Sequence, residues 1–350
     1  MKLADETAAA PSSASCALGP HRVCTLDAQH LCAPTFPSAT IYYPESGTRL
    51  PSIVIVGGWG CGEQVQAAWA PFYASHGIVA MTIGTPAPLT DMCEERARAL
   101  LDASAALQDE NAREGSALVG RLDASSRAVQ GYSLGGGGAQ LAALRDPTLK
   151  CVVAICPDDG GVFGRKPPAE LSPSVPVLFL CGEKDTDAPP QSHAWKHYQK
   201  TGAAKLLFEV QGGCHYFANG PAGDATEAEA TRGACDEALL CNCLGVLVSR
   251  GACAPCPCSF GMVLGSGGHA RADAPRGAVG LLALAWLRLF LLRDETARSQ
   301  LAARPGIARN FESSGIETST PSEVNESSGI ETATPAELET ATPAEVMERG

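Results

Sequence analysis

The stretch Gly131-Tyr132-Ser133-Leu134-Gly135, which three further glycines follow at 136–138, decides the fold of this chain. A strand-like apolar run, 128–130, precedes it, and a helix-like run, 139–144, follows it. A G-x-S-x-G pattern in this setting predicts a sharp turn, because only residues without bulk fit there and hold the serine hydroxyl exposed. The N-terminus of the following helix directs N–H groups at whatever the serine attacks. We therefore predict that Ser133 is a nucleophile. The alternative is a glycine-rich turn that contains a serine by chance.

The serine hydroxyl needs a base that accepts its proton, and His215 is the predicted base. In this class of fold the histidine follows the serine in the chain and lies on a loop after a strand. A strand-like run, 206–210, ends in Gln211-Gly212-Gly213-Cys214-His215. The strand end and the glycine pair disfavour the alternative, an ordinary surface histidine. The other histidines lack such a setting: His21, His30, His76, His193, His197 and His269.

An acid that orients the histidine should lie between the serine and the histidine in the chain. The buried-strand run 175–180 ends in a loop that carries Glu183, Asp185 and Asp187. We predict that Asp185 is the acid and that the other two are solvated loop charges.

The tetrahedral intermediate of acyl transfer needs two N–H donors. One is predicted to be the backbone N–H of Leu134, the residue after the nucleophile. The other should come from the loop after an earlier strand. The run 53–56 leads into Gly57-Gly58-Trp59-Gly60, and we assign the N–H of Trp59. The Trp59 ring is expected to pack over this loop or to form a wall of the acyl pocket, and the two roles are compatible.

With these residues the chain resembles the α/β-hydrolases of the dienelactone-hydrolase and cutinase-like branch, and most of all the bacterial poly(ethylene terephthalate) hydrolases. The resemblance covers about residues 38–219 and 276–295. The matching stretches are Ala39-Thr40-Ile41-Tyr42-Tyr43-Pro44, Ala74-Ser75-His76-Gly77, the serine motif with its four glycines, Glu183-Lys184-Asp185, Gly212-Gly213-Cys214-His215 and Ala285-Trp286-Leu287-Arg288. It implies carboxylic ester hydrolysis, with the triad on Ser133, Asp185 and His215 and the oxyanion donors on Trp59 and Leu134.

The chain departs from that family around the predicted pocket. An aromatic residue usually precedes the nucleophile, and Tyr132 satisfies this. A ring usually stands in the loop after the next strand, where this chain has Cys156-Pro157-Asp158-Asp159. A carboxylate at 158 cannot stack on an aromatic acyl group and keeps its own water. We expect Trp59, Tyr132 and Asp158 to line the substrate site, and short-chain or polar esters to be preferred over aromatic polyesters.

The expected function is therefore cleavage of carboxylic esters through an acyl-enzyme on Ser133, a route that needs no metal or organic cofactor. Alternative substrates within the fold are a lactone, a thioester or a chlorophyll-type ester. An alternative of another class is a non-catalytic binding protein, which the intact triad and glycines disfavour. The expected partner is a small-molecule ester bound by a monomer.

Length and composition limit what else the chain can be. Its 350 residues with 45% hydrophobic content are enough for one hydrolase domain of ~250 residues and additional segments. Most of the net charge of −12 lies near the C-terminus, so nothing indicates nucleic-acid binding. The first residues lack the apolar region of a signal peptide, and the longest apolar run, 279–292, is too short and interrupted to span a bilayer. We expect a cytoplasmic protein.

The order of patterns along the chain favours an α/β fold. Strand-like and helix-like runs alternate between residues 22 and 210, which predicts a mostly parallel central sheet with helices on both faces. The opening strands should run antiparallel to the rest. The expected parts are a disordered N-terminus at 1–19, the α/β-hydrolase core at 20–219, a Cys-rich insertion at 220–275, a C-terminal helix of the same domain at 276–300 and a disordered acidic repeat tail at 301–350.

Fifteen cysteines are many, and without an export signal we interpret most of them as reduced thiols. Cys181 and Cys214 end neighbouring strands beside the site, and a disulfide between them is a minor alternative. Six cysteines lie within the insertion: Cys235, Cys241, Cys243, Cys253, Cys256 and Cys258. Their spacing lacks the paired Cys-x-x-Cys of zinc ribbons, so a lineage-specific disordered insertion is favoured over a metal site. Translated non-coding sequence is a further alternative.

Overall fold

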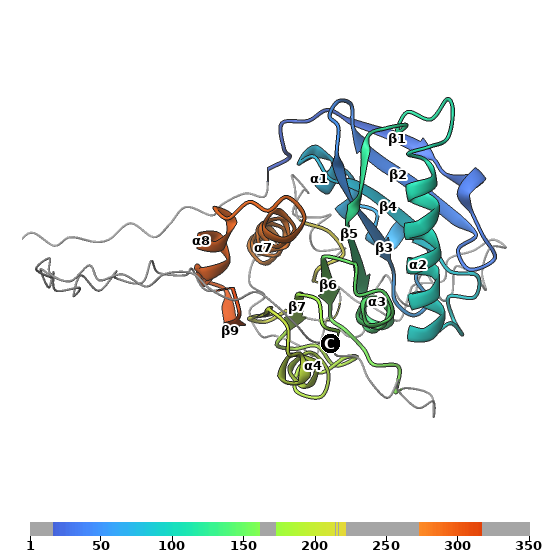
Figure 1. Cartoon of the computed structure of the whole chain (residues 1–350). Helices are drawn as coiled ribbons and strands as arrows, with labels where there is room; N and C mark the ends of the chain where they lie inside the picture. The colour runs from blue at the N-terminus through green and yellow to red at the C-terminus, as the bar shows by residue number, and fades with distance from the viewer. Residues whose placement is uncertain (1–16, 162–172, 214, 216, 222–272, 317–350) are drawn as a thin grey trace, which may run out of the picture. The chain divides into compact units, whose positions relative to one another are not determined.

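One nine-stranded sheet organises the computed structural model, which describes residues 17–161, 173–213, 215, 217–221 and 273–316. The strand order is β1-β2-β4-β3-β5-β6-β7-β8-β9, and helices cover both faces (Figure 1). The strands are β1 (Val23–Asp27), β2 (Ser38–Pro44), β3 (Leu50–Val56), β4 (Val79–Gly84), β5 (Leu122–Tyr132), β6 (Cys151–Ile155), β7 (Val177–Gly182), β8 (Lys205–Val210) and β9 (Ala308–Ser314). The helices are η1 (Gln29–Leu31), η2 (Glu63–Gln66), α1 (Trp69–Ser75), α2 (Cys93–Asp109), α3 (Leu134–Arg145), α4 (Ala194–Lys200), α7 (Asp273–Leu291) and α8 (Ala297–Ala302).

The central strands run parallel, as the alternation of patterns predicts. The neighbours β4, β3, β5, β6, β7 and β8 all pair in parallel. Strand β2 pairs antiparallel with β4 and with β1, and β9 pairs antiparallel with β8. The expectation that the opening strands both oppose the rest is therefore wrong for β1. Since β1 reverses direction relative to β2, it runs with the parallel strands.

The hydrophobic core lies in two layers, one on each face of the sheet. One layer joins α1, α7 and α8 to the sheet and contains the large buried rings of Trp69 and Trp286. The other joins α2, α3 and α4 to the opposite face. Strands β3, β4, β6 and β7 are buried along their whole length. This double burial explains why they read as continuous apolar runs in the sequence.

The C-terminal part of the domain differs from the expectation. The single helix expected at 276–300 is two helices, α7 and α8. Asp294, in the turn between them, pairs with Arg288 of α7. The expectation of a tail without structure from residue 301 is wrong for residues 301–316, because α8 continues to Ala302 and β9 pairs with β8. Phe311 packs edge-on against Phe208, with ring centroids 6.1 Å apart. An edge strand exposes most of its side chains, so its polar sequence resembles a tail.

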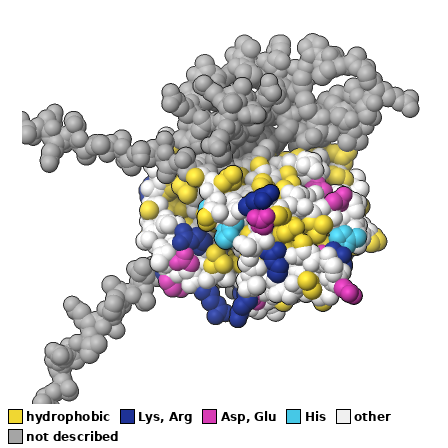
Figure 2. All heavy atoms as spheres, turned by 90° about the horizontal axis from the view of Figure 1, so that it is seen from above, with side chains coloured by type: hydrophobic (Ala, Val, Ile, Leu, Met, Phe, Trp, Pro, Cys, Tyr) yellow, Lys and Arg dark blue, Asp and Glu magenta, His cyan; other side chains and the backbone are white. Residues whose placement is uncertain are grey.

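Several expectations fall outside the described residues. These are the N-terminus at 1–16, the Cys-rich insertion at 222–272, residue Cys214 with its potential disulfide partner role, and the repeats beyond 316. Among the described helices, none has the length and apolar character needed to cross a membrane. On the described part of the face in Figure 2, acidic and basic side chains are interspersed with apolar ones.

Candidate active site

Ser133 lies at the turn between β5 and α3, in a backbone conformation that non-glycine residues rarely adopt (φ 56°, ψ −123°). Its N–H donates to the carbonyl oxygen of Ile155 at 2.8 Å. Its carbonyl oxygen accepts from the N–H groups of Gly136 at 2.8 Å and Asp158 at 3.0 Å. The neighbouring segments therefore hold the strained serine in place, and such strain is typical of functional sites.

The glycines around the serine are required by close backbone contacts. A Cβ on Gly131 would lie 1.8 Å from the carbonyl oxygen of Gly135, and one on Gly137 would lie 2.1 Å from that of Asp158. A Cβ on Gly138 would lie 2.8 Å from the Cβ of Arg96 on α2. The first turn of α3 thus packs directly against β5, the loop after β6 and α2. These contacts explain the run of four glycines.

Three residues predicted from the sequence meet in one chain of hydrogen bonds. Nε2 of His215 lies 3.0 Å from Oγ of Ser133. Nδ1 of His215 lies 2.9 Å and 2.8 Å from the two carboxylate oxygens of Asp185. A carboxylate only accepts, so Nδ1 carries the proton and Nε2 is left to accept from the serine hydroxyl. All three side chains are buried, with 4–7% of each residue exposed.

The topology of the sheet explains how residues 133, 185 and 215 come together. They follow β5, β7 and β8, three parallel strands whose carboxyl ends lie at the same edge. Functional residues of open α/β sheets gather at that edge. In the acidic loop, the carboxylate of Asp185 pairs with His215. The N–H of Asp187 supports the Asp185 carboxylate at 3.0 Å, and Glu183 accepts from the N–H of Gly212 at 2.8 Å.

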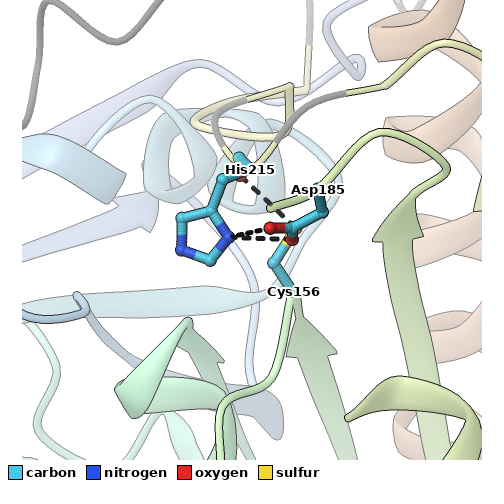
Figure 3. Close-up of side chains that lie close together, drawn as sticks. All are labelled: Cys156, Asp185 and His215. Carbon is cyan, nitrogen blue, oxygen red and sulfur yellow. Dashed lines mark hydrogen bonds and ion pairs between the residues drawn. The ribbon is translucent and has the colours of Figure 1, made fainter. Parts of the chain in front are cut away.

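Two further residues contact His215, one at its backbone and one at its ring. Figure 3 shows Cys156 beside the His215–Asp185 pair, and Sγ of Cys156 donates to the backbone oxygen of His215 at 3.4 Å. The ring of Tyr132 packs on the His215 imidazole, with centroids 5.1 Å apart. Tyr132 is only 2% exposed and its ring supports the histidine, and the expectation that it also lines the substrate site stays a prediction. Sequence reasoning missed Cys156 at the site, and its position directly after β6 was the available signal.

The loop after β3 lies directly against the nucleophile. A Cβ on Gly58 would stand 2.6 Å from Cβ and 3.2 Å from Oγ of Ser133, so only backbone fits there. Leu134 begins α3, and the N–H of a first helical residue has no partner within its helix. The indole N–H of Trp59 donates to the carbonyl oxygen of Leu89 at 2.7 Å, which fixes its half-buried ring over the loop. The backbone around 58–59 and 134 thus borders Ser133 on two sides.

A polar cluster occupies the loop after β6. Related hydrolases usually have an aromatic ring in this loop, and this chain has Asp158 and Asp159 there. Asp158 is 5% exposed, and its Oδ1 accepts from the N–H of Gly160 at 2.6 Å. Burial raises the pKa of the Asp158 carboxyl above its usual range. Ligand-type atoms of Asp158, Asp159 and His193 lie within 4.8 Å of one another, and Asp159 pairs with Lys196 at 2.8 Å.

The donor atoms around the site could in principle hold a metal ion, but most of them already have partners. Two sets of described residues have donors close enough to hold an ion, namely Asp158 with Asp159 and His193, and Cys156 with Asp185 and His215. In the first set Lys196 already supplies a cation to Asp159, and in the second the imidazole and carboxylate bind each other. Their existing partners favour a hydrogen-bonded site over a metal centre.

Comparisons with known proteins agree with this geometry. A model of the PET hydrolase-like family matches residues 4–229. Cutinase 2 of Thermobifida cellulosilytica is 34% identical over 206 residues, which are 58% of this chain and 74% of that protein. Cutinase cut1 of Thermobifida fusca is 34% identical over 206 residues, or 58% of this chain and 61% of the relative. A bis(hydroxyethyl) terephthalate hydrolase of Streptomyces coelicolor is 32% identical over 212 residues, or 59% and 64%.

Proposed function

We propose how ester cleavage proceeds in this chain, which belongs to the PET hydrolase-like family and is a carboxylic ester hydrolase with the α/β-hydrolase fold. Ser133 is the nucleophile, His215 the general base and acid, and Asp185 the residue that orients His215. The observation that carries these roles is the unbroken chain of hydrogen bonds from Oγ of Ser133 through both ring nitrogens of His215 to Asp185. The lactone, thioester, chlorophyll-ester and non-catalytic alternatives are not favoured.

The first half of the reaction forms the acyl-enzyme. Oγ of Ser133 attacks the ester carbonyl carbon while its proton passes to Nε2 of His215, and Asp185 stabilises the imidazolium. The carbonyl oxygen becomes an oxyanion that accepts from the backbone N–H groups of Trp59 and Leu134. The intermediate then collapses: the carbon–alkoxy bond breaks, and His215 returns the proton to the leaving oxygen.

Water completes the cycle by the same route. His215 takes a proton from the water as its oxygen attacks the acyl carbon, and the same two N–H groups hold the second oxyanion. The carbon–Oγ bond then breaks, Oγ regains the proton from His215, and the carboxylic acid leaves. Every proton is carried by His215, so this scheme places no step on a cofactor.

We further propose that the preferred substrates are short-chain or polar esters. The supporting observation is the polar cluster beside the nucleophile: the N–H of Asp158 binds the Ser133 carbonyl oxygen, and Asp159, His193 and Lys196 follow it outward. Carboxylate and ammonium groups are costly to cover with an apolar acyl group, and they offer no face for stacking. Three of the relatives are named for cutin or for a terephthalate ester, and this chain's cluster favours less aromatic acyl groups.

A comparison of p-nitrophenyl esters tests this preference. We expect kcat/KM for the acetate and butyrate to exceed that for the benzoate. In Asp158→Trp, the benzoate-to-acetate ratio should rise by roughly 2–10-fold, because a stacked ring can add about 0.5–1.5 kcal/mol. Asp158→Asn is the matched control, since it keeps an oxygen for the N–H of Gly160 but adds no ring. A wild-type preference for benzoate, or equal ratios in all three proteins, would contradict the substrate proposal.

A further inference from the structure

Arg96 on α2 is a fully buried cation that the catalytic scheme does not use. Its residue exposure is 0%. Every hydrogen bond that its guanidinium makes with described residues goes to a main-chain carbonyl oxygen. In the loop after β3, Nε donates to Gly57 at 3.0 Å and Nη2 to Gly58 at 2.6 Å. In the segment between β4 and α2, the acceptors are Pro88, Asp91 and Met92.

This arrangement is unusual for a buried charge. Burying a guanidinium is costly unless its donors are satisfied, and a carboxylate is the ordinary partner. Two acids close to Arg96 in the chain have other partners: Asp91 accepts from the N–H of Ala87, and Glu95 accepts from the N–H of Met92. Burial lowers the pKa of Arg96, yet an arginine stays protonated in proteins. Arg96 is therefore a cation whose field acts directly on the carbonyl groups of two loops.

One of these carbonyls belongs to the peptide group that faces the nucleophile. The carbonyl oxygen of Gly58 and the N–H of Trp59 are the two ends of a single planar peptide unit. A hydrogen bond from Nη2 to that oxygen fixes the plane of the unit. It also polarises the unit, because electron density drawn toward the oxygen leaves the N–H a stronger donor. On its other side, Gly58 is in contact with Ser133.

Further contacts tie the two loops together around Arg96. The N–H of Gly60 donates to the carbonyl oxygen of Pro88 at 3.0 Å, so Pro88 accepts from both Gly60 and Arg96. The Trp59 indole N–H donates to Leu89 beside it. Gly138 on α3 leaves room for the Arg96 side chain, since a Cβ there would reach within 2.8 Å of the Cβ of Arg96. The Arg96 side chain thus runs from the contact between α2 and α3 to the two loops.

We propose that Arg96 is a positioning residue of the oxyanion site: it orients and polarises the Gly58–Trp59 peptide so that the Trp59 N–H stabilises the tetrahedral intermediate. This inference rests on the proposed function, because it assumes the Trp59 N–H as one of the two donors. Removal of Arg96 should therefore weaken binding of the transition state more than binding of the substrate.

The test compares Arg96→Met and Arg96→Lys with wild type on p-nitrophenyl acetate. Rates are normalised to active sites titrated with a fluorophosphonate, so that unfolded protein does not count. We expect kcat of Arg96→Met to fall by at least about tenfold with KM changed less than about threefold, which is the signature of an interaction made in the transition state. Affinity for an alkyl trifluoromethyl ketone, whose adduct with Ser133 carries an oxyanion, should fall by a similar factor. The kcat and the ketone affinity of Arg96→Lys should lie between those of wild type and Arg96→Met, because an ammonium keeps the charge but not the planar fork.

Arg127 on β5 provides the matched control. It is an arginine with 18% of its side chain exposed, and it binds Asp146, Thr148 and Ser104 away from the site. Arg127→Met should lower the melting temperature and leave kcat per titrated site unchanged. If the Arg96 variants behaved in the same way, Arg96 would be a purely structural residue and the inference would be overturned. Failure of both Arg96 variants to fold, when Arg127→Met folds, would also assign Arg96 to folding and overturn it.

Ser133→Ala in the same assay distinguishes a failure of the proposed ester hydrolysis from a failure of the role proposed for Arg96. Retained turnover in Ser133→Ala would refute the proposed function itself. An inactive Ser133→Ala together with Arg96 variants of full kcat and unchanged ketone affinity would refute only the role of Arg96.

Discussion

Asp185 differs from the other acids of its loop in what its carboxylate binds. Oδ1 accepts from the N–H groups of Asp187 at 3.0 Å and Ala188 at 2.8 Å, and both oxygens face His215. The sequence could restrict the choice to three acids on one loop. It could not select among them by pattern alone, because the selection depends on how the loop folds back on itself. The structure brings Ser133, His215 and Asp185 together, and their catalytic roles stay predictions.

Substitutions in this loop test the role of Asp185. In Asp185→Asn we expect kcat on p-nitrophenyl acetate to fall by roughly 10²–10⁴-fold, because an amide no longer stabilises the imidazolium or holds the correct tautomer. Asp187→Asn and Glu183→Gln are the matched controls and should keep kcat within about threefold of wild type. A large loss in either control, with Asp185→Asn still active, would move the acid to another residue.

The buried imidazole of His197 on α4 predicts a pH dependence of stability. It is 4% exposed, and its Nε2 makes no hydrogen bond with the described residues. Burial lowers its pKa to about 4, whereas an unfolded histidine titrates near pH 6.5. Between these two values the unfolded chain binds a proton that the folded chain does not. Stability is therefore lost progressively as the pH falls from about 6.5 to about 4.

His197→Phe should remove most of this dependence. Urea unfolding at pH 7 and pH 4.5 should show the wild-type free energy of unfolding falling by an extra amount, at most about 2–3 kcal/mol, relative to the variant. His21→Phe, at an exposed position, is the control and should follow wild type. Parallel curves for wild type and His197→Phe would mean that other groups cause the acid sensitivity.

At the level of elements, the first turn of α3 is placed by close backbone contacts at its glycines. The glycine run was predicted from the sequence as a turn and helix start, but its partners on α2 and on the loops after β3 and β6 are distant in the chain. Such contacts leave no mark in sequence periodicity. A similar limit applied to β9, whose polar, mostly exposed residues gave no apolar alternation from which a strand could be predicted.

Gly137→Ala tests this packing. Its Cβ would stand 2.1 Å from the Asp158 carbonyl oxygen, so α3 or the loop after β6 must shift. We expect a loss of about 1–3 kcal/mol in the free energy of unfolding, although alanine is otherwise the better helix former. Gly202→Ala, where no heavy atom lies within 4 Å of the added Cβ, should be nearly neutral. Equal stability of the two variants would contradict the close contact.

Two truncations test β9 as part of the domain. A chain that ends at residue 316 should keep the wild-type melting temperature and kcat, because β9 remains paired with β8. A chain that ends at residue 303 loses β9, including Phe311, and leaves the edge of β8 unpaired. Its melting temperature should fall by at least about 5 °C. If both truncations were equally stable, β9 would be dispensable, and the domain would end near residue 300, as the sequence alone predicts.

In the whole molecule, the parallel direction of the central strands and the meeting of residues 133, 185 and 215 could be predicted together, whereas the direction of β1 and the strand β9 could not. Alternating strand and helix patterns indicated parallel strands, and parallel strands place their following loops at one edge. Residues 133, 185 and 215 are far apart in the chain and meet there for that reason. What remained hidden was the support around them. No motif predicts the contacts of Cys156 and Tyr132 with His215, or that of Arg96 with the Gly58–Trp59 peptide. These contacts depend on how distant segments pack in three dimensions.

Ester cleavage by this protein depends on Ser133, which we predict to attack the carboxylic ester with the help of His215 and to carry the acyl group. Labelling with a fluorophosphonate followed by peptide mass spectrometry tests it most directly. We expect one adduct per protein molecule, on the peptide that contains Ser133. We also expect slow or absent labelling in His215→Ala and none in Ser133→Ala, with p-nitrophenyl acetate turnover lost in parallel. An adduct on another serine, or unchanged labelling and turnover in Ser133→Ala, would show that Ser133 is not the nucleophile.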